Sequence, residues 1–177
     1  MKKLILIFFL LYNTHAFAQW YNPENVPKKL GYKYGIALNE SQIKNYDKAL
    51  ALLDECIEAE PKFVDAWLSK AGILSDQKKY PAAVQAYEKG ILLDTVYSFN
   101  FLLPYSIALA GNGRFKEALF AINKLLSKPT TPERFKKRGF FRKKSYEFAV
   151  ALAEQQNNSK YIFNPINLGD KIGRAHV

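Results

Sequence analysis

The feature that most constrains this chain is a pairing of an aromatic ring with a small residue that recurs three times. Ala49, Ala83 and Ala118 each follow an aromatic residue by three positions, and the steps between these alanines are 34 and 35 residues. A period of about 34 residues is typical of a helix–turn–helix unit that stacks on copies of itself. One such unit cannot bury its apolar face alone, so neighbouring units share a continuous core. The pattern therefore predicts an all-α fold made of stacked helical hairpins.

The predicted repeats occupy residues 30–130 and divide into three units, 30–63, 64–97 and 99–130. The second unit is the clearest. Its polar stretch 76–79 predicts a turn between two amphipathic helices, and the second helix is expected to begin near Tyr80. Residues at helical spacing predict the inner face of this hairpin, on which the small residues Ala83 and Gly90 let the two helices approach closely. This face consists of Trp67, Ala71, Leu74, Ala83, Tyr87 and Gly90.

A further helix is predicted after the repeats, at residues 131–156. Thr131, Pro132 and Glu133 form a helix start signal, with a capping hydroxyl, a proline at the first helical position and an acid in the first turn. The apolar stripe Phe141, Phe148 and Leu152 is expected to cover the third repeat, because the last unit of a stack needs a cap.

The repeat residues resemble the tetratricopeptide repeat family, and the second unit fits its pattern best. Lys70, Thr95 and Leu125 depart from that pattern. The resemblance implies a right-handed superhelix of three helical hairpins with a fourth capping helix and an extended C-terminal segment. It also implies a groove that holds a peptide or helix of another protein. The side chains expected to line that groove, with packing between repeats as the alternative, are Tyr34, Leu38, Gln42, Asp65, Leu68, Asp76, Asn100, Leu103 and Ile107.

Some members of that family clamp a C-terminal carboxylate with a Lys and an Asn. Tyr34 and Leu38 stand where those two residues would be needed. We therefore do not expect binding of a chaperone tail by that clamp.

The two ends of the chain are expected to lie outside the repeat fold. Residues 1–18 have a short basic start, an apolar stretch and an Ala-Phe-Ala cleavage site, which predicts a secretory signal peptide. Residues 19–29 are then an N-terminal extension. At the other end, residues 157–171 are predicted to be a polar linker and the start of a truncated downstream domain. Residues 172–177 resemble an in-frame translation of a sequencing adapter.

The stretch 163–170 resembles the lead-in to a β-propeller in a group of exported Bacteroidetes proteins. Members of that group carry an export signal, tetratricopeptide repeats, a WD-like propeller and an OmpA-like peptidoglycan-binding domain. The resemblance implies a non-catalytic scaffold in the periplasm, associated with the outer membrane and linked to peptidoglycan through the domains that follow. Its partner would be another envelope protein, bound in the groove of the repeats, and no nucleic acid would be bound.

The residue counts exclude several kinds of chemistry. His15 and His176 both lie in the two ends set aside above, so residues 19–171 contain no histidine for a nucleophile–base pair. Cys56 is the single cysteine of the chain, which rules out an internal disulfide and leaves no His and Cys set for zinc. We therefore predict no catalytic residue, no metal site and no cofactor. A targeting module of an envelope enzyme, with its catalytic domain downstream, is the alternative.

Positive charge dominates residues 19–171. Without Lys2, Lys3 and Arg174, 23 of the 26 basic residues remain against 16 acidic residues, a formal charge of +7. The charge concentrates at the start of the last predicted helix, where it is either a solvated face or a contact for an acidic partner or anionic lipid. This basic cluster consists of Arg134, Lys136, Lys137, Arg138, Arg142, Lys143 and Lys144.

Overall fold

The computed structural model describes residues 26–157, and every element in this part of the chain is helical. The predictions for residues 1–18 and 172–177 lie outside the described residues, as do residues 19–25 of the predicted extension 19–29 and all but the first residue of the predicted linker 157–171. The elements are α1 (Lys28–Gln42), α2 (Tyr46–Ala59), α3 (Val64–Asp76), α4 (Tyr80–Leu93), the 3-10 helix η1 (Tyr97–Phe101), α5 (Leu102–Gly111), α6 (Phe115–Ser127) and α7 (Glu133–Asn157). The predicted all-α fold class is confirmed.

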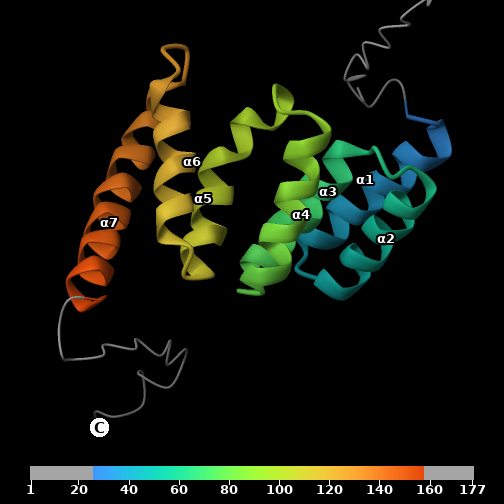
Figure 1. The fold of residues 1–177 in the computed structure, drawn as a ribbon. Coiled ribbons are helices and arrows are strands. Elements are labelled where there is room, and N and C mark those ends of the chain that lie inside the picture. Colours follow the sequence, from blue (N-terminus) through green and yellow to red (C-terminus); the bar gives the residue numbers. More distant parts are fainter. Residues whose placement is uncertain (1–25, 158–177) are drawn as a thin grey trace, which may run out of the picture.

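Figure 1 shows the helices as a row of hairpins in chain order, with α7 at one end. The pairs α1/α2, α3/α4 and α5/α6 each form a hairpin, and the second helix of one hairpin packs on the first helix of the next. The last helix, α7, packs mainly on α6 and also contacts α5. Among residues 26–157, no helix is both long enough and apolar enough to cross a bilayer.

The recurring alanines lie at the centres of the hairpins. Ala49, Ala83 and Ala118 are all 0% exposed, as the repeat predicts. The aromatic residue three positions before each alanine is the first residue of α2, α4 and α6. The 34-residue pattern therefore marks the same structural position in each hairpin.

The three hairpin turns share one backbone geometry. Lys44, Lys78 and Gly113 have φ angles of 63°, 59° and 77°, the left-handed conformation that commonly ends a helix. In each turn the next residue donates its N–H to a carbonyl five positions back, at 2.8 to 2.9 Å. Only the third turn has a glycine at the left-handed position, so the first two hold a lysine in a conformation that costs about 1–2 kcal/mol.

Close approach between helices depends on two glycines. A Cβ atom added to Gly90 of α4 would lie 2.7 Å from Leu68 Cδ2 of α3, so only a glycine lets α3 and α4 pack at this distance. A Cβ atom on Gly111 would lie 2.6 Å from the ring of Tyr80. Tyr80 is the first residue of α4 and Gly111 is the last residue of α5, so this ring fills the space between the second and third hairpins.

The packed face of α7 differs from the predicted one. Phe141 and Phe148 are 69% and 70% exposed, so the two rings of the predicted stripe point away from the third hairpin, while its third member, Leu152, is half-buried. The face that packs on α6 carries Gly139 and Tyr146 instead, and a Cβ on Gly139 would lie 3.0 Å from Leu126 Cδ2. Gly139 lets this face approach α6 closely, because a larger side chain at this position would meet Leu126.

The start of α7 also differs from the prediction. Thr131 does not cap this helix, because the N–H groups of the helix's first turn donate to the carbonyl of Pro132 and not to the Thr131 hydroxyl. These donors are the backbone N–H groups of Phe135 and Lys136. The Thr131 hydroxyl instead donates to the carbonyl of Leu125 at 2.8 Å, near the end of α6. Thr131 therefore satisfies a free carbonyl at the C-terminus of α6, a position where a helix lacks its own partners.

Candidate functional site

The first helices of neighbouring hairpins are joined by hydrogen bonds between polar side chains. The hydroxyls of Tyr34 on α1 and Ser69 on α3 lie 2.8 Å apart. The hydroxyl of Tyr97 on η1 donates to the carboxylate of Asp65 on α3. Burial raises the pKa of Asp65 above its usual value, while the hydrogen bond from Tyr97 acts in the opposite direction. These bonds fix the spacing of α1, α3 and η1.

The residues predicted to line a groove have very different exposures. Gln42, Asp76 and Asn100 are exposed, Tyr34, Leu38 and Ile107 are half-buried, and Asp65, Leu68 and Leu103 are buried. Leu68 packs against Gly90, and both Leu68 and Leu103 belong to the hydrophobic core of the second and third hairpins. For these two leucines the structure fits the alternative interpretation, which is packing between helices.

Three of the predicted groove residues meet in one hollow between α5 and α7, which we call the α5–α7 hollow. Its volume is about 400 Å³, and its lining residues are Asn100, Phe101, Leu103, Pro104, Ile107, Phe135 and Arg138. No residue of α6 lines it, although α6 packs on both α5 and α7, so it opens on the side away from α6. Sequence reasoning did not identify Phe101, Pro104 and Phe135. For Phe135 the reason is that the repeat pattern does not fix the register of α7.

A second, smaller hollow of about 170 Å³ adjoins the first and shares Asn100 and Phe135 with it. Lys128 lies at its edge, with Nζ 4.3 Å from the centre of the Phe99 ring, close enough for a cation–π contact. Arg138 lines the larger hollow. Neither lining includes a carboxylate. The combined surface therefore has apolar side chains, the neutral polar residues Asn100, Thr130 and Thr131, and one positive side chain from each hollow.

The predicted basic cluster does not form a single patch on α7. Arg138 faces the α5–α7 hollow, whereas Lys143 forms an ion pair with Glu147 at 3.7 Å on the same helix. The guanidinium of Arg134 lies 4.8 Å from the ring of Phe135. Arg134, Lys137, Arg138 and Lys144 are exposed, while Lys136, Arg142 and Lys143 are half-buried. The positive charges therefore divide between the hollow and the outer surface.

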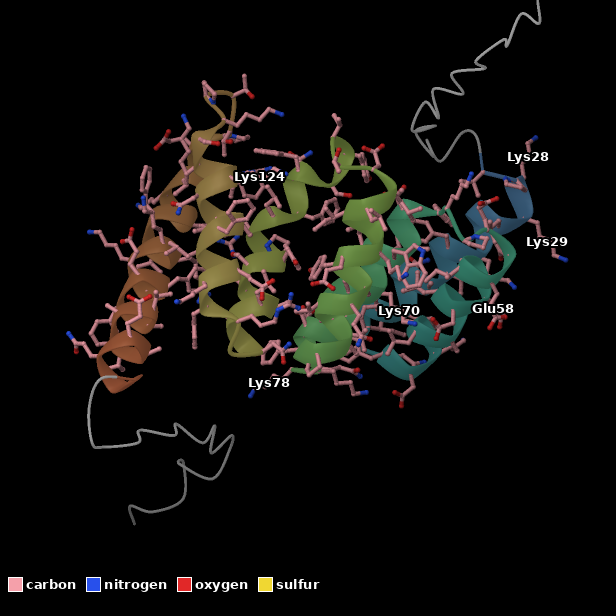
Figure 2. All side chains as sticks on the ribbon, in the orientation of Figure 1. Lys28, Lys29, Glu58, Lys70, Lys78 and Lys124 are labelled. Carbon is pink, nitrogen blue, oxygen red and sulfur yellow. The ribbon has the colours of Figure 1, made fainter. Side chains whose placement is uncertain are left out.

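Other charged side chains project into solvent. Lys28 and Lys29, at the start of α1, point away from the stack of hairpins (Figure 2).

Cys56 of α2 is buried, and burial raises the pKa of its thiol. Within residues 26–157, no group of three or more His, Cys, Asp or Glu side chains is placed to hold a metal ion.

Solved structures with a similar fold include several peptide-binding proteins. The type III secretion translocator chaperone SycD of Yersinia enterocolitica, in complex with a peptide of the translocator YopD, aligns with a TM-score of 0.62 and 16% identity, covering 70% of this chain and 96% of that one. The first tetratricopeptide domain of Spaghetti (RPAP3), bound to an HSP90 peptide, aligns with a TM-score of 0.63 and 14% identity, covering 70% and 94%. At these identities the similarity establishes the fold alone.

PcrH in complex with the chaperone-binding region of PopD aligns with a TM-score of 0.62 and 16% identity, covering 70% of this chain and 94% of that one. A comparison with curated proteins gives no match. The sequence model of the tetratricopeptide repeat matches residues 30–63 and 64–97. Those residues form the hairpins α1/α2 and α3/α4, with the recurring alanine buried in each. Residues 30–97 are therefore the part of this chain that matches the tetratricopeptide repeat in both sequence and fold.

Proposed function

We propose that this chain is a non-catalytic interaction protein that binds a segment of another protein in the α5–α7 hollow. One observation carries the proposal: apolar side chains, Asn100 and Arg138 line the hollow, a second hollow lined by Lys128 adjoins it, and neither lining contains a carboxylate. An apolar surface with a few placed polar groups is typical of a ligand site. The first helices of tetratricopeptide hairpins supply binding surfaces in many repeat proteins.

The lining indicates the chemistry of the segment that would bind. Phe101, Ile107 and Phe135 would contact a bulky apolar side chain. Arg138 and Lys128 would each attract a carboxylate next to that side chain, since both are positive and neither hollow supplies an acid. The ligand is therefore a peptide segment with an apolar anchor flanked by acidic residues.

The similar structures support this mode of binding. SycD was crystallised with a translocator peptide, PcrH with the chaperone-binding region of PopD, and Spaghetti with an HSP90 peptide. A fold that holds peptides in those proteins is a suitable frame for the same task here. The Lys and Asn clamp expected for a free C-terminus is missing at Tyr34 and Leu38, so the segment bound here would be an internal one.

The cellular setting forms part of the same proposal. The predicted signal peptide supports export, and with it a partner in the bacterial envelope. Association with the outer membrane and peptidoglycan would come from domains downstream of residue 171. Expression in a bacterial host followed by mass measurement of the periplasmic protein tests this setting. Cleavage after Ala18 is the expected result, and an uncleaved cytoplasmic chain would contradict it.

A random-peptide display screen tests the binding site. We expect selected peptides to share a bulky apolar residue next to Asp or Glu. Ile107→Asp should weaken their binding at least about tenfold, because it places a charge in the apolar lining. Arg138→Ala should weaken acidic peptides more than neutral ones. Leu92→Asp, at an exposed position of α4 outside the hollow, is the matched control. Peptides that bind Ile107→Asp as well as the unaltered chain would contradict the proposal.

A further inference from the structure

The outer face of α7 carries two aromatic rings that the described fold does not use. Phe141 and Phe148 are 69% and 70% exposed and lie seven residues apart, two helical turns along the same side. The opposite side of α7 packs on α6 through Gly139 and Tyr146. A helix of 25 residues at the end of a stack would ordinarily present polar residues to solvent, as terminal repeats do.

Basic residues share this outer face with the rings. Arg134, Lys137, Phe141 and Lys144 follow one another at steps of three, four and three residues, so all belong to one stripe along the helix. We call this set the outer stripe: Arg134, Lys137, Phe141, Lys144 and Phe148. All five side chains are exposed.

Acidic residues are absent from the outer stripe. Glu147 pairs with Lys143 at 3.7 Å, and Glu154 pairs with Lys116 of α6 at 3.0 Å. The carboxylates of α7 that form ion pairs thus bind lysines outside the stripe. Within the described residues, no ion pair involves Lys137 or Lys144. Glu133, one residue before Arg134, is exposed and also forms no ion pair among residues 26–157. The stripe therefore presents positive charge that no ion pair offsets, beside exposed apolar rings.

We propose that the outer stripe of α7 binds the surface of an anionic lipid bilayer. A helix with basic residues and phenylalanines on one face binds such a surface by burying the rings at the headgroup boundary while the cations attract the lipid phosphates. The helix is about 37 Å long, at 1.5 Å per residue, and it lies at the end of the stack (Figure 1). A flat surface can therefore contact the whole stripe.

Two other occupants fit the stripe less well. A second copy of the chain would place two uncompensated positive stripes together, which like-charge repulsion opposes. An acidic protein partner would be expected to use a shaped pocket, and no residue of the stripe lines any of the hollows described above. A fluid anionic surface needs no pocket, because its headgroups rearrange around the bound side chains.

Vesicle co-sedimentation with the full chain tests the proposal. Vesicles of phosphatidylcholine with about one third phosphatidylglycerol are compared with vesicles of phosphatidylcholine alone. The apolar segment within residues 1–18 is expected to bind both kinds, so the measured quantity is the excess binding to anionic vesicles. The full chain should show a clear excess at low salt that falls as added salt shortens the range of electrostatic attraction.

Paired variants locate the contact. Lys137→Ala/Lys144→Ala should reduce the excess roughly 25-fold, because each basic residue near an anionic surface contributes about fivefold. Phe141→Ser/Phe148→Ser should also reduce it by at least about tenfold. The matched controls are Lys89→Ala/Lys124→Ala, which removes the same charge from α4 and α6, and Phe120→Ser, at a ring of α6 that is 73% exposed. Ile107→Asp, in the α5–α7 hollow, should leave vesicle binding unchanged.

Three results would overturn the proposal. The first is equal binding to neutral and anionic vesicles. The second is a loss of anionic binding that is as large in the controls as in the stripe variants, which would indicate attraction by total charge alone. The third is binding of a soluble glutamate-rich helical peptide to the stripe with no excess binding to vesicles, which would assign the face to an acidic protein. Circular dichroism of each variant confirms that the altered chain is folded.

Discussion

Replacing Gly90 with alanine would test the close packing on which the stack depends. Gly90 lies within α4 and is buried. The added Cβ would lie 2.7 Å from Cδ2 and 2.9 Å from Cγ of Leu68, far inside normal contact distance. Leu68 is 2% exposed, so its side chain cannot swing into solvent to make room. Either the leucine leaves its rotamer or α3 and α4 move apart.

Two opposing effects set the size of the change. Alanine in place of glycine within a helix normally stabilises by about 0.8–1 kcal/mol. Extra volume in a packed core costs about 1–3 kcal/mol. At Gly90 we expect the packing cost to exceed the gain in helix propensity, with a net loss of about 1 kcal/mol in the free energy of unfolding. Gly72 of α3 isolates the propensity effect, because a Cβ there has no atom within 4 Å. Gly72→Ala should therefore stabilise by about 1 kcal/mol.

Urea denaturation followed by far-UV circular dichroism measures both changes as shifts of the midpoint. A Leu68→Ala background gives a sharper test, because it removes the Cγ and Cδ2 atoms that the new methyl group would strike. In that background Gly90→Ala should change sign and become stabilising by up to about 1 kcal/mol. If Gly90→Ala stabilised the unaltered chain as much as Gly72→Ala does, the close approach of α3 and α4 at this point would be refuted.

Three further predictions concern buried polar groups. Thr131→Val should cost about 1–3 kcal/mol, because the carbonyl of Leu125 loses its donor; Thr131→Ser should restore most of it, and equal urea midpoints for both variants would contradict this role. Because the pKa of Asp65 is raised in the folded chain, the unfolded state ionises first as pH rises. The free energy of unfolding, measured relative to that of Asp65→Asn, should therefore fall as pH rises from about 3.8 through the raised pKa. A constant difference between the two chains across that range would contradict this prediction. Cys56 should react with a thiol reagent only on unfolding, because it is buried and its thiol pKa is raised; rapid reaction of the native chain would show that α2 opens.

The sequence predicts the hairpins well because their signal recurs. A single alanine does not predict a helical hairpin, but Ala49, Ala83 and Ala118 repeat at nearly constant spacing, and each occupies the same buried position. The aromatic residue before each alanine recurs with it and begins the second helix of its hairpin. A repeated environment constrains the same side chain several times, so the prediction does not depend on any single position.

The rotation of α7 could not be predicted in the same way. This helix occurs once, and its apolar residues lie on more than one side, so helical spacing alone admits more than one packed face. The face that packs carries Gly139, and its close contact with Leu126 is a tertiary effect that periodicity does not report. The α5–α7 hollow was missed in part for the same reason. Asn100, Leu103 and Ile107 were identified from repeat positions, whereas Phe135 enters the hollow only once α7 is placed.

The two sides of α7 should be separable by experiment. Tyr146 is buried against the third hairpin, with its hydroxyl 3.4 Å from that of Ser106, so Tyr146→Ala should destabilise the stack by about 3–5 kcal/mol as other large core truncations do. Phe141 and Phe148 contribute little to that packing, so Phe141→Ser/Phe148→Ser should shift the unfolding free energy by no more than about 0.5 kcal/mol. A stable double serine variant that no longer binds anionic vesicles would show that the outer rings act in binding and not in folding. A large loss of stability in that variant would instead mean that the rings support the fold. The outer stripe could then not be treated as a binding surface separate from the packed side of α7.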